Sequence, residues 1–357
     1  MGNQITKDQH YVSDFLLRYF RCDTRKGKKS TINIFDIKKS EVSYNQPTRG
    51  SGRFSQNYFY DKDNLTEKFI ADKIEAPASG VIDKIVNGNF HILSEDMLTL
   101  HRFISSLYWR TPEANERVSK FINSMLESII REGLSLNGFD PEEASAGKFD
   151  LDIASLMTHQ GFIIARILGD LEYHIIKNET QSEFYISDHP VFIYNWLYRN
   201  LEHPEVTSFS AVGLQIFLPL SPKLMLCLYD PKVYKYGQRN SVTYISDDSD
   251  IEILNSFQII NSSSVIGFHS KESEAHVKQL YKKYKGFKLH HYESKSSIKK
   301  EDQEEIISTH SVFTRQAKLK KMPSFIKIKR KSKGYASSYQ ERDTELKEDI
   351  LSQLRSI

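Results

Sequence analysis

Five polar residues stand out because each lies among apolar neighbours in a separate segment of the chain. They are His10, Arg18, Glu75, Arg110 and Asp188. Histidine and carboxylate side chains can act as general acids or bases near neutral pH, so His10, Glu75 and Asp188 are the expected catalytic residues. Arginine binds planar anions such as phosphate through paired hydrogen bonds. We therefore expect Arg18 and Arg110 to contact a nucleic-acid backbone.

Structural explanations compete with these roles. His10 can simply begin a helix, and Arg18 can belong to an ion pair that only stabilises the fold. Glu75 and Glu67 lie eight residues apart on one predicted helix, where glutamate is usually exposed to solvent. Arg110 follows Trp109 at the end of another predicted helix, where it can cap free carbonyl groups. The residue types alone do not decide between the two interpretations.

The sharpest local signal is the sequence SDHP at residues 187–190, which follows the apolar strand-like run FYI. Pro190 restricts the backbone of this turn, so Asp188 has a defined direction at the end of the strand. Active-site acids often lie on such turns. The alternative is a turn in which Asp188 accepts hydrogen bonds from nearby backbone groups.

The segment between Lys278 and Lys333 is strongly basic, with 17 Lys or Arg and 5 Asp or Glu, although the whole chain has a net charge of only +3. Tyr284 and Phe287 are among its interleaved aromatic residues. Cations neutralise phosphates and aromatic rings stack on bases, so nucleic acid, most simply DNA, is the expected partner. The alternative is a solvated tail. The expected binding residues here are Lys318, Lys320, Lys321, Lys327, Lys329, Arg330 and Lys331.

The composition of the 357 residues, 39% hydrophobic and 27% charged, is typical of a globular protein. No run approaches the ~18 apolar residues of a membrane helix, so no stable membrane association is expected. Two cysteines form neither a disulfide framework nor a four-cysteine zinc site, which favours a cytoplasmic location. Nucleotide-binding glycine loops and the common hydrolase motifs are missing. The sequence therefore leaves any cofactor or metal unknown.

Hydrophobic periodicity predicts the elements that must position these groups. Helices are expected at 10–20, from Asn64 to about 85 with a kink at Pro77, at 94–111, from 113 to about 132, at 150–176 and at 250–260. Strands are expected at 31–37, 183–187, 190–196, 213–219, 223–229 and 264–269, and residues 40–57 are expected to form a loop.

This order predicts an α+β fold, with a helical N-terminal half packed on a mainly antiparallel sheet and a basic C-terminal extension. The expected division is an α+β domain at 1–275 and a partly flexible extension at 276–357. Apolar residues from Leu346 to Ile357 form one helical stripe. That terminal helix is expected either to pack on its own domain or to contact a partner or a second copy.

Six blocks of the sequence resemble the domain-of-unknown-function 4238 family over about residues 8–270. They are HYVSDFLLRYF at 10–20, NYFYDKDNLTEKFIADKIE at 57–75, FISSLYWRTP at 103–112, FYISDHPV at 184–191, FLPLSPKLMLCLYD at 217–230 and ILNSFQI at 253–259. The family pattern has proline where this chain has Ser13, and often asparagine where it has His189. The resemblance implies that the five polar residues belong to the family pattern, and it implies a place near phage-defence genes.

We expect a nucleic-acid-directed hydrolase that acts against foreign DNA. Arg18, Arg110 and the basic extension would hold phosphates, Asp188 or Glu75 would activate water or stabilise positive charge, and His10 would move a proton. Cleavage of a phosphodiester would call for a divalent metal, whereas an N-glycosidic bond could be cut without one. The alternatives are a non-enzymatic sensor or effector that binds nucleic acid or another ligand, and an enzyme acting on a small metabolite.

Overall fold

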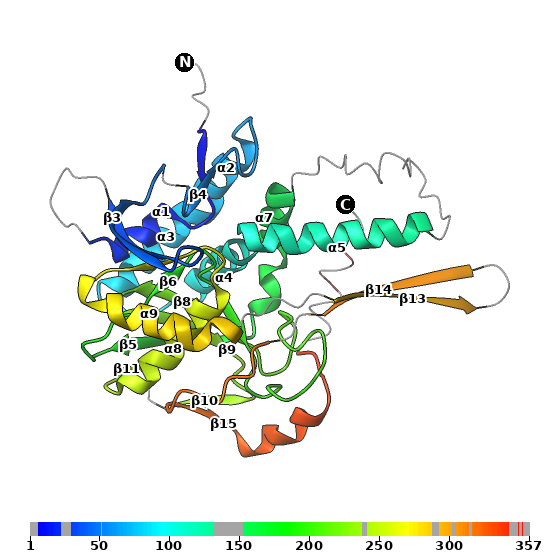
Figure 1. The fold of residues 1–357 in the computed structure, drawn as a ribbon. Helices are drawn as coiled ribbons and strands as arrows, with labels where there is room; N and C mark the ends of the chain where they lie inside the picture. The colour runs from blue at the N-terminus through cyan, green and yellow to red at the C-terminus, as the bar shows by residue number, and fades with distance from the viewer. Residues whose placement is uncertain are drawn as a thin grey trace.

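The computed structural model describes residues 6–22, 30–50, 52–131, 153–237, 241–287, 293–301, 305–313 and 316–342, together with Asp349 and Ser352. The fold is α+β, with two main sheets whose strands are mostly antiparallel and with helices on both sides of them (Figure 1). The predicted fold class is confirmed at this level.

A five-stranded sheet lies at the centre of the molecule, in the order β11-β5-β9-β8-β7. Its strands are β5 (Glu172–Asn178), β7 (Phe192–Tyr194), β8 (Gln215–Ser221), β9 (Leu224–Tyr229) and β11 (Val242–Ile245). The β11–β5 pair is parallel and the other pairs are antiparallel. Every residue of β8 and β9 is buried, because both faces of the sheet are covered.

A four-stranded antiparallel sheet has the order β3-β2-β12-β6 and brings distant parts of the chain together. Its strands are β2 (Thr31–Asp36), β3 (Glu41–Pro47), β6 (Ile186–Ser187) and β12 (Val265–Phe268). Three antiparallel pairs complete the described strands: β1 (Asp8–His10) with β4 (Ser55–Asn57), β10 (Tyr234–Tyr236) with β15 (Ile326–Ile328), and β13 (Glu293–Glu301) with β14 (Glu305–Phe313).

The helices surround these sheets. They are α1 (Asp14–Leu17), α2 (Leu65–Phe69), α3 (Ala76–Val86), α4 (Ser94–Trp109), α5 (Pro112–Arg131), α7 (Ile153–Ile164), α8 (Asp248–Asn261) and α9 (Glu274–Tyr284). A π-helical segment, Ile70–Glu75, joins α2 to α3. Short 3₁₀ helices include Arg18–Phe20, Ala165–Leu168, Lys285–Phe287 and Arg330–Ser337.

The core has two main layers because alternate residues of a strand point to opposite faces. Leu226 and Leu228 of β9 belong to the first layer, with residues of α3 and α4. Met225 and Cys227 of the same strand belong to the second, with residues of α8. A smaller cluster lies between α9 and the four-stranded sheet. The five-stranded sheet therefore separates the surroundings of α1 to α4 from those of α8.

Two predicted elements are wrong. Residues 40–57 are not a loop but contain β3 and β4, whose mostly exposed residues lack the apolar alternation that marks a half-buried strand. The long helix expected at 150–176 ends as α7 at Ile164, and the chain turns at Gly169 into β5. A continuous apolar run cannot by itself distinguish a helix from a buried strand. The N-terminal half is thus not purely helical.

The segment after residue 275 is not detached from the domain. Val277 and Leu280 of α9 are buried against the four-stranded sheet. Further along, Ala317, Leu319 and the pair at 325–326 are buried in the second core layer. A few well-placed apolar residues therefore dock a segment whose overall composition is polar. The predicted amphipathic helix from Leu346 to Ile357 lies almost entirely outside the described residues.

Within the part of the chain that the structure describes, every helix is too short or too polar to cross a membrane.

Candidate functional site

Arg110 lies at the C-terminal end of α4 and is completely buried, with 0% of its side chain exposed. Its Nη2 donates to Glu75 Oε1 at 2.7 Å and to the hydroxyl of Ser13. Its Nε and Nη1 have no hydrogen-bond partner among the described residues. Buried donors are normally paired, because an unpaired one costs about 1–3 kcal/mol. Arg110 is therefore a positive charge with unused donors inside the protein.

The helix around Glu75 is not a regular α-helix. Pro77 lies in the first turn of α3 and cannot donate a backbone hydrogen bond to the preceding turn. The chain responds with the π-helical segment that ends at Glu75, rather than with the simple kink expected from the sequence. Single π-helical turns are common at functional sites. This turn orients Glu75 towards the buried end of α4.

Glu67, on α2, is the second acid of this group. Its Oε2 is buried and has no hydrogen-bond partner among the described residues. Burial, followed by the nearby charge of Glu75, raises the pKa of Glu67 to about 7, although the charge of Arg110 acts in the opposite direction. A carboxylic acid that is half protonated near neutral pH can donate or accept a proton.

Tyr60 and Ser13 complete what we call the Arg110 cluster: Ser13, Tyr60, Glu67, Glu75 and Arg110. Tyr60 is buried and its hydroxyl donates to the carbonyl oxygen of His10 at 2.9 Å. Ser13 precedes α1 but forms no helix-capping hydrogen bond through its side chain, whose hydroxyl accepts from Arg110 instead. The first turn of α1 is thereby tied to the end of α4.

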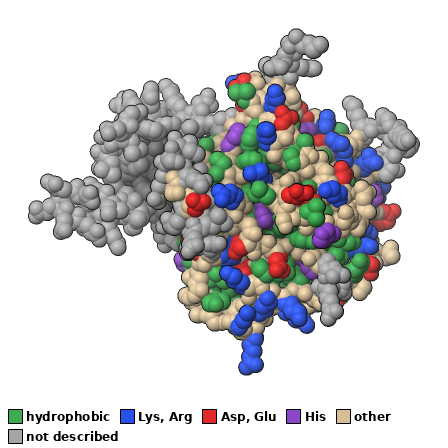
Figure 2. All heavy atoms as spheres, turned by 180° about the vertical axis from the view of Figure 1, so that it is seen from behind, with side chains coloured by type: hydrophobic (Ala, Val, Ile, Leu, Met, Phe, Trp, Pro, Cys, Tyr) green, Lys and Arg blue, Asp and Glu red, His purple; other side chains and the backbone are tan. Residues whose placement is uncertain are grey.

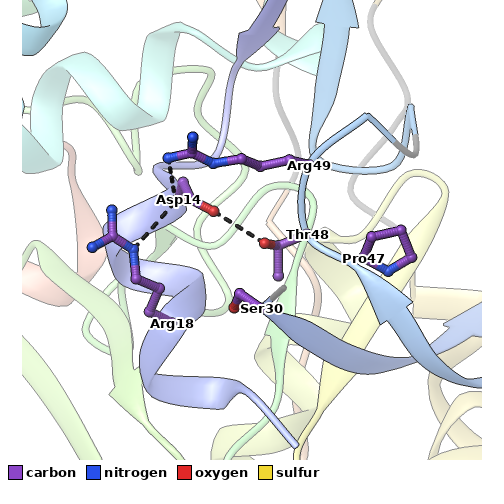
Figure 3. Close-up of a pocket in the computed structure, with 6 residues that line it drawn as sticks. All are labelled: Asp14, Arg18, Ser30, Pro47, Thr48 and Arg49. Atoms are coloured by element: carbon purple, nitrogen blue, oxygen red, sulfur yellow. Dashed lines mark hydrogen bonds and ion pairs between the residues drawn. The ribbon is translucent and has the colours of Figure 1, made fainter. Parts of the chain in front are cut away.

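An open pocket of about 490 Å³ lies beside α1 (Figure 3). We call it the Asp14 pocket, and it is lined by Asp14, Arg18, Ser30, Pro47, Thr48 and Arg49. Asp14 Oδ2 accepts from Arg18 Nε at 3.2 Å and from Arg49 Nη2 at 2.6 Å, and Asp14 Oδ1 accepts from the Thr48 hydroxyl at 3.0 Å. Partial burial acts in the opposite direction, but Arg49 and Thr48 lower the pKa of Asp14.

The two arginines of this pocket are 53% and 67% exposed, so their remaining N–H groups are open to solvent or to a ligand. One carboxylate, Asp14, holds both guanidinium groups, which leaves this trio with a net positive charge. Such a pair of arginines suits a phosphate. The hydrogen bond with Asp14 is the main cause that raises the pKa of Arg49, and the charge of Glu75 contributes to that increase.

His10 lies between the Asp14 pocket and the Arg110 cluster. Its Nε2 is 3.3 Å from the carbonyl oxygen of Thr48, and its own carbonyl oxygen accepts from Tyr60. The structure thus gathers four of the five expected site residues around α1, in two adjoining groups. His10 and Arg18 surround Asp14, whereas Glu75 pairs with Arg110.

Asp188, the fifth expected site residue, uses both of its carboxylate oxygens in hydrogen bonds to a loop. Its Oδ1 accepts from the backbone N–H of Ser263 at 2.9 Å, and its Oδ2 accepts from the N–H and the hydroxyl of Ser264, each at 2.7 Å. Burial raises the pKa of Asp188, while these hydrogen bonds act in the opposite direction. Both oxygens are thus used to hold the loop before β12. The neighbouring His189 is also buried, and its Nδ1 shares a hydrogen bond with the hydroxyl of Thr111.

The sequence was compared with family models, curated proteins and solved structures. The family described as "Protein of unknown function (DUF4238)" matches residues 8–272. The chain belongs to the DUF4238 family. Neither a curated protein nor a solved structure shows significant similarity to it. The family match includes the Arg110 cluster and the Asp14 pocket, so both lie in the part of the chain that the family shares, and the suspected family is confirmed.

The seven lysine and arginine residues of the basic extension that were expected to bind nucleic acid lie beyond the DUF4238 match. The structure places them on the α8 side of the five-stranded sheet. Lys318 pairs with Glu202 at 3.4 Å, and Lys329 donates to the carbonyl oxygen of Pro231. Lys320 and Lys321 line a second pocket, and Lys327, Arg330 and Lys331 are exposed on β15 and the following 3₁₀ helix. Figure 2 shows Lys and Arg side chains projecting at the lower edge, where these elements lie in Figure 1.

No group of three or more His, Cys, Asp or Glu side chains is arranged to hold a metal ion among the residues that the structure describes. Glu75 is paired with Arg110, and Asp188 with backbone donors. The pair proposed from the sequence as metal ligands, Glu75 and Asp188, therefore does not form a metal site with a third such ligand within the described part of the chain.

Sequence reasoning missed Asp14, Thr48 and Arg49 as site residues, and weighed Glu67 without selecting it. Arg49 lies in the segment interpreted as a loop. Its position beside α1 follows from β3, which ends two residues before it and was not predicted. The signal that could have identified Glu67 was its spacing from Glu75, with Pro77 following directly after Glu75 and Ala76. A proline inside a helix that carries two acids indicates irregular geometry at those acids.

Proposed function

We propose that this DUF4238 chain is a nucleic-acid-directed hydrolase whose Arg110 cluster cleaves the N-glycosidic bond of an unpaired nucleotide. A role in defence against foreign DNA belongs to the same proposal. The observation that carries it is the buried Arg110, which pairs with one glutamate beside a second and keeps two donor nitrogens unpaired among the described residues.

The two glutamates suit different parts of such a reaction. Glu67, with a pKa of about 7, would donate a proton to the departing base as the bond between the sugar C1′ and the base nitrogen breaks. The Glu75 carboxylate, held by Arg110, would stabilise the positive charge that develops on the sugar. Water would then add to C1′ and return a proton to Glu67. The overall reaction consumes one water molecule and gives the free base and a sugar with a hydroxyl group at C1′.

The Asp14 pocket provides the place for the phosphate. Arg18 and Arg49 present exposed guanidinium groups beside α1, next to the Arg110 cluster. A phosphate bound there would fix the adjoining sugar relative to the two glutamates, and positioning of this kind supplies a large part of enzymatic rate enhancement. An acid with a raised pKa beside a paired carboxylate favours cleavage of the N-glycosidic bond over cleavage of the phosphodiester. The sequence left both bonds equally open.

The test is to incubate the purified full-length protein with a labelled single-stranded oligonucleotide and with plasmid DNA, in Mg²⁺ or in EDTA. We expect free base and alkali-labile sites in both buffers, without direct nicking. Nicks that require Mg²⁺ would support phosphodiester cleavage instead. Binding without any product would support the non-enzymatic sensor.

A matched pair of variants links the product to the cluster. Glu67→Gln removes the proton donor and should lower the rate of base release by at least about 100-fold, in the range typical for a lost general acid. Asp72→Asn changes an exposed acid of the adjoining π-helical segment and should leave the rate unchanged. Equal rates for the two variants would contradict the assignment of Glu67.

A further inference from the structure

A second pocket, of about 380 Å³, lies between α8, the end of α9 and residues 319–321. We call it the α8–α9 pocket. It lies on the α8 side of the five-stranded sheet, and the Arg110 cluster lies on the other side. The hydrolytic mechanism uses none of its residues. Its size is within the range of pockets that hold small ligands.

Two aromatic rings form part of its wall. Tyr284 and Phe287 are half-buried, and their ring centroids are 5.7 Å apart with a tilt of 52°. Both pack against the second core layer, so that layer fixes their positions. Leu319 adds a buried apolar side chain to the lining. The wall of the pocket thus offers ring faces held in place by the core.

Cations surround these rings. Lys283 pairs with Glu252, and its ammonium group lies 5.3 Å from the centre of the Tyr284 ring. Lys320 and Lys321 are exposed, and neither has an ion-pair partner in the part of the chain that the structure describes. Because Glu252 offsets Lys283, the charges of Lys320 and Lys321 stay uncompensated at the pocket.

The backbone that carries these lysines is fixed at both ends. On one side, the N–H of Leu319 donates to the Tyr194 hydroxyl at 3.2 Å. On the other side, the buried Asp250 of α8 accepts from the N–H and the hydroxyl of Ser324, at 2.7 and 2.6 Å. The lysines therefore belong to a docked segment rather than to a free tail, and their separation from the rings is set by the fold.

We infer that the α8–α9 pocket binds an unpaired base of single-stranded DNA, with the base stacked on Tyr284 or Phe287 and a flanking phosphate near Lys320 and Lys321. Aromatic faces beside uncompensated lysines are the combination that holds single strands without regard to sequence. This inference rests on the proposed function for the class of partner, and it adds a binding site remote from the hydrolytic cluster.

The experiment measures fluorescence anisotropy of a labelled oligothymidine bound to the full-length Glu67→Gln protein, in which hydrolysis is blocked. Phe287→Leu, which keeps an apolar side chain but removes the ring, should weaken binding about 10-fold. Lys320→Gln with Lys321→Gln should weaken it similarly and reduce the slope of log affinity against log salt by about 1.4. The control, Lys38→Gln with Lys39→Gln, removes two exposed lysines of the turn between β2 and β3 and should retain the affinity.

A second arm requires no variant in the pocket. An oligonucleotide of the same length that lacks all bases is measured with the Glu67→Gln protein, in which Phe287 is intact. It should bind about as weakly as oligothymidine binds when Phe287→Leu is added. Equal affinity for strands with and without bases would overturn the inference, as would an unchanged affinity in Phe287→Leu. Base-dependent binding without any hydrolysis by the unmutated protein would support the pocket while contradicting the proposed hydrolase. Hydrolysis with no effect of Phe287→Leu would support the hydrolase while contradicting the pocket.

Discussion

Two groups of charged side chains with buried polar atoms differ in their hydrogen bonds. Asp188 and Glu183 each accept from two backbone N–H groups and a serine hydroxyl, so their oxygens are fully engaged. Glu67 has a buried oxygen without a partner, and the neighbouring Arg110 has two such nitrogens, among the described residues. The first group holds loops in place. The second retains unused capacity to bind or to exchange a proton.

Under the proposed function, this contrast separates structural from functional acids better than burial does. A carboxylate surrounded by backbone donors can be moved only by breaking the loop that supplies them, and its chemistry is already committed to folding. A carboxylic acid that lacks a partner is costly to bury, and such exceptions call for an explanation. In the Arg110 cluster the explanation we offer is catalysis.

The largest expected effect is on stability, at Asp188. Asp188→Ala removes the buried acceptor of two backbone N–H groups and one hydroxyl in a half-buried loop, so the free energy of unfolding should fall by about 4 kcal/mol. Urea denaturation followed by circular dichroism measures the change. Asp72→Ala, at an exposed position, should have almost no effect. A loss below about 1 kcal/mol at Asp188 would remove the contrast between the two groups of acids.

The next largest effect is expected for Arg110→Met. Loss of the buried cation leaves Glu75 without its ion-pair partner, and the free energy of unfolding should fall by about 3 kcal/mol. Because the charge of Arg110 lowers the pKa of Glu67, that pKa should also rise above about 7 in this variant. Base release should be lost at the same time. A variant that is less stable but fully active would show that Arg110 is only structural.

The pH dependence of stability gives an effect of similar size. The folded protein keeps the Glu67 proton until about pH 7, whereas the unfolded chain releases it near its ordinary pKa of 4.5. Between these values the folded state binds more protons, so the Glu67 contribution to stability is present below pH 4.5 and is lost as the pH rises to about 7. This loss, at about 1.4 kcal/mol for each unit between the two pKa values, amounts to about 3 kcal/mol and should be absent in Glu67→Gln. Thermal melts of Glu67→Gln and Asp72→Asn between pH 4.5 and about pH 7 measure this difference. If stability falls with pH equally in the two variants, the raised pKa of Glu67 is contradicted.

The smallest effect on stability is expected in the Asp14 pocket. Arg49 is largely exposed, so Arg49→Gln should change the free energy of unfolding by less than about 1 kcal/mol. It should nevertheless weaken binding of single-stranded DNA and reduce the salt slope by about 0.7. Arg166→Gln, at an exposed arginine beyond α7, serves as the control. An unchanged salt slope in Arg49→Gln would exclude a phosphate from this pocket.

The elements with strong hydrophobic periodicity could be predicted from the sequence. The helix from Ser94 to Trp109 and the buried strands β8 and β9 lie close to their expected ranges. The edge strand β3 could not be predicted, because its polar residues need no apolar face. The docking of the basic segment also escaped prediction, since single buried residues such as Phe325 leave no periodic signal.

The candidate site could likewise be predicted only in part from the sequence. The sequence identified Glu75 and Arg110 as polar residues in apolar surroundings, and their ion pair agrees with a shared location. It could not reveal that Asp188 faces the N–H groups of Ser263 and Ser264, because those donors come from a segment about 75 positions away. Long-range hydrogen bonding, which decides whether an acid is committed to the fold, has no local signature.

The protonation state of Glu67 in the folded protein decides whether the Arg110 cluster can supply a proton near neutral pH. Carbon-13 NMR of protein labelled at the glutamate side-chain carboxyl carbon can follow each glutamate as a function of pH. We predict one resonance that titrates at about pH 7, disappears in Glu67→Gln and persists in Asp72→Asn. If Glu67→Gln instead removes a resonance that titrates near 4.5, Glu67 is an ordinary acid and the Arg110 cluster is not a proton-donating centre.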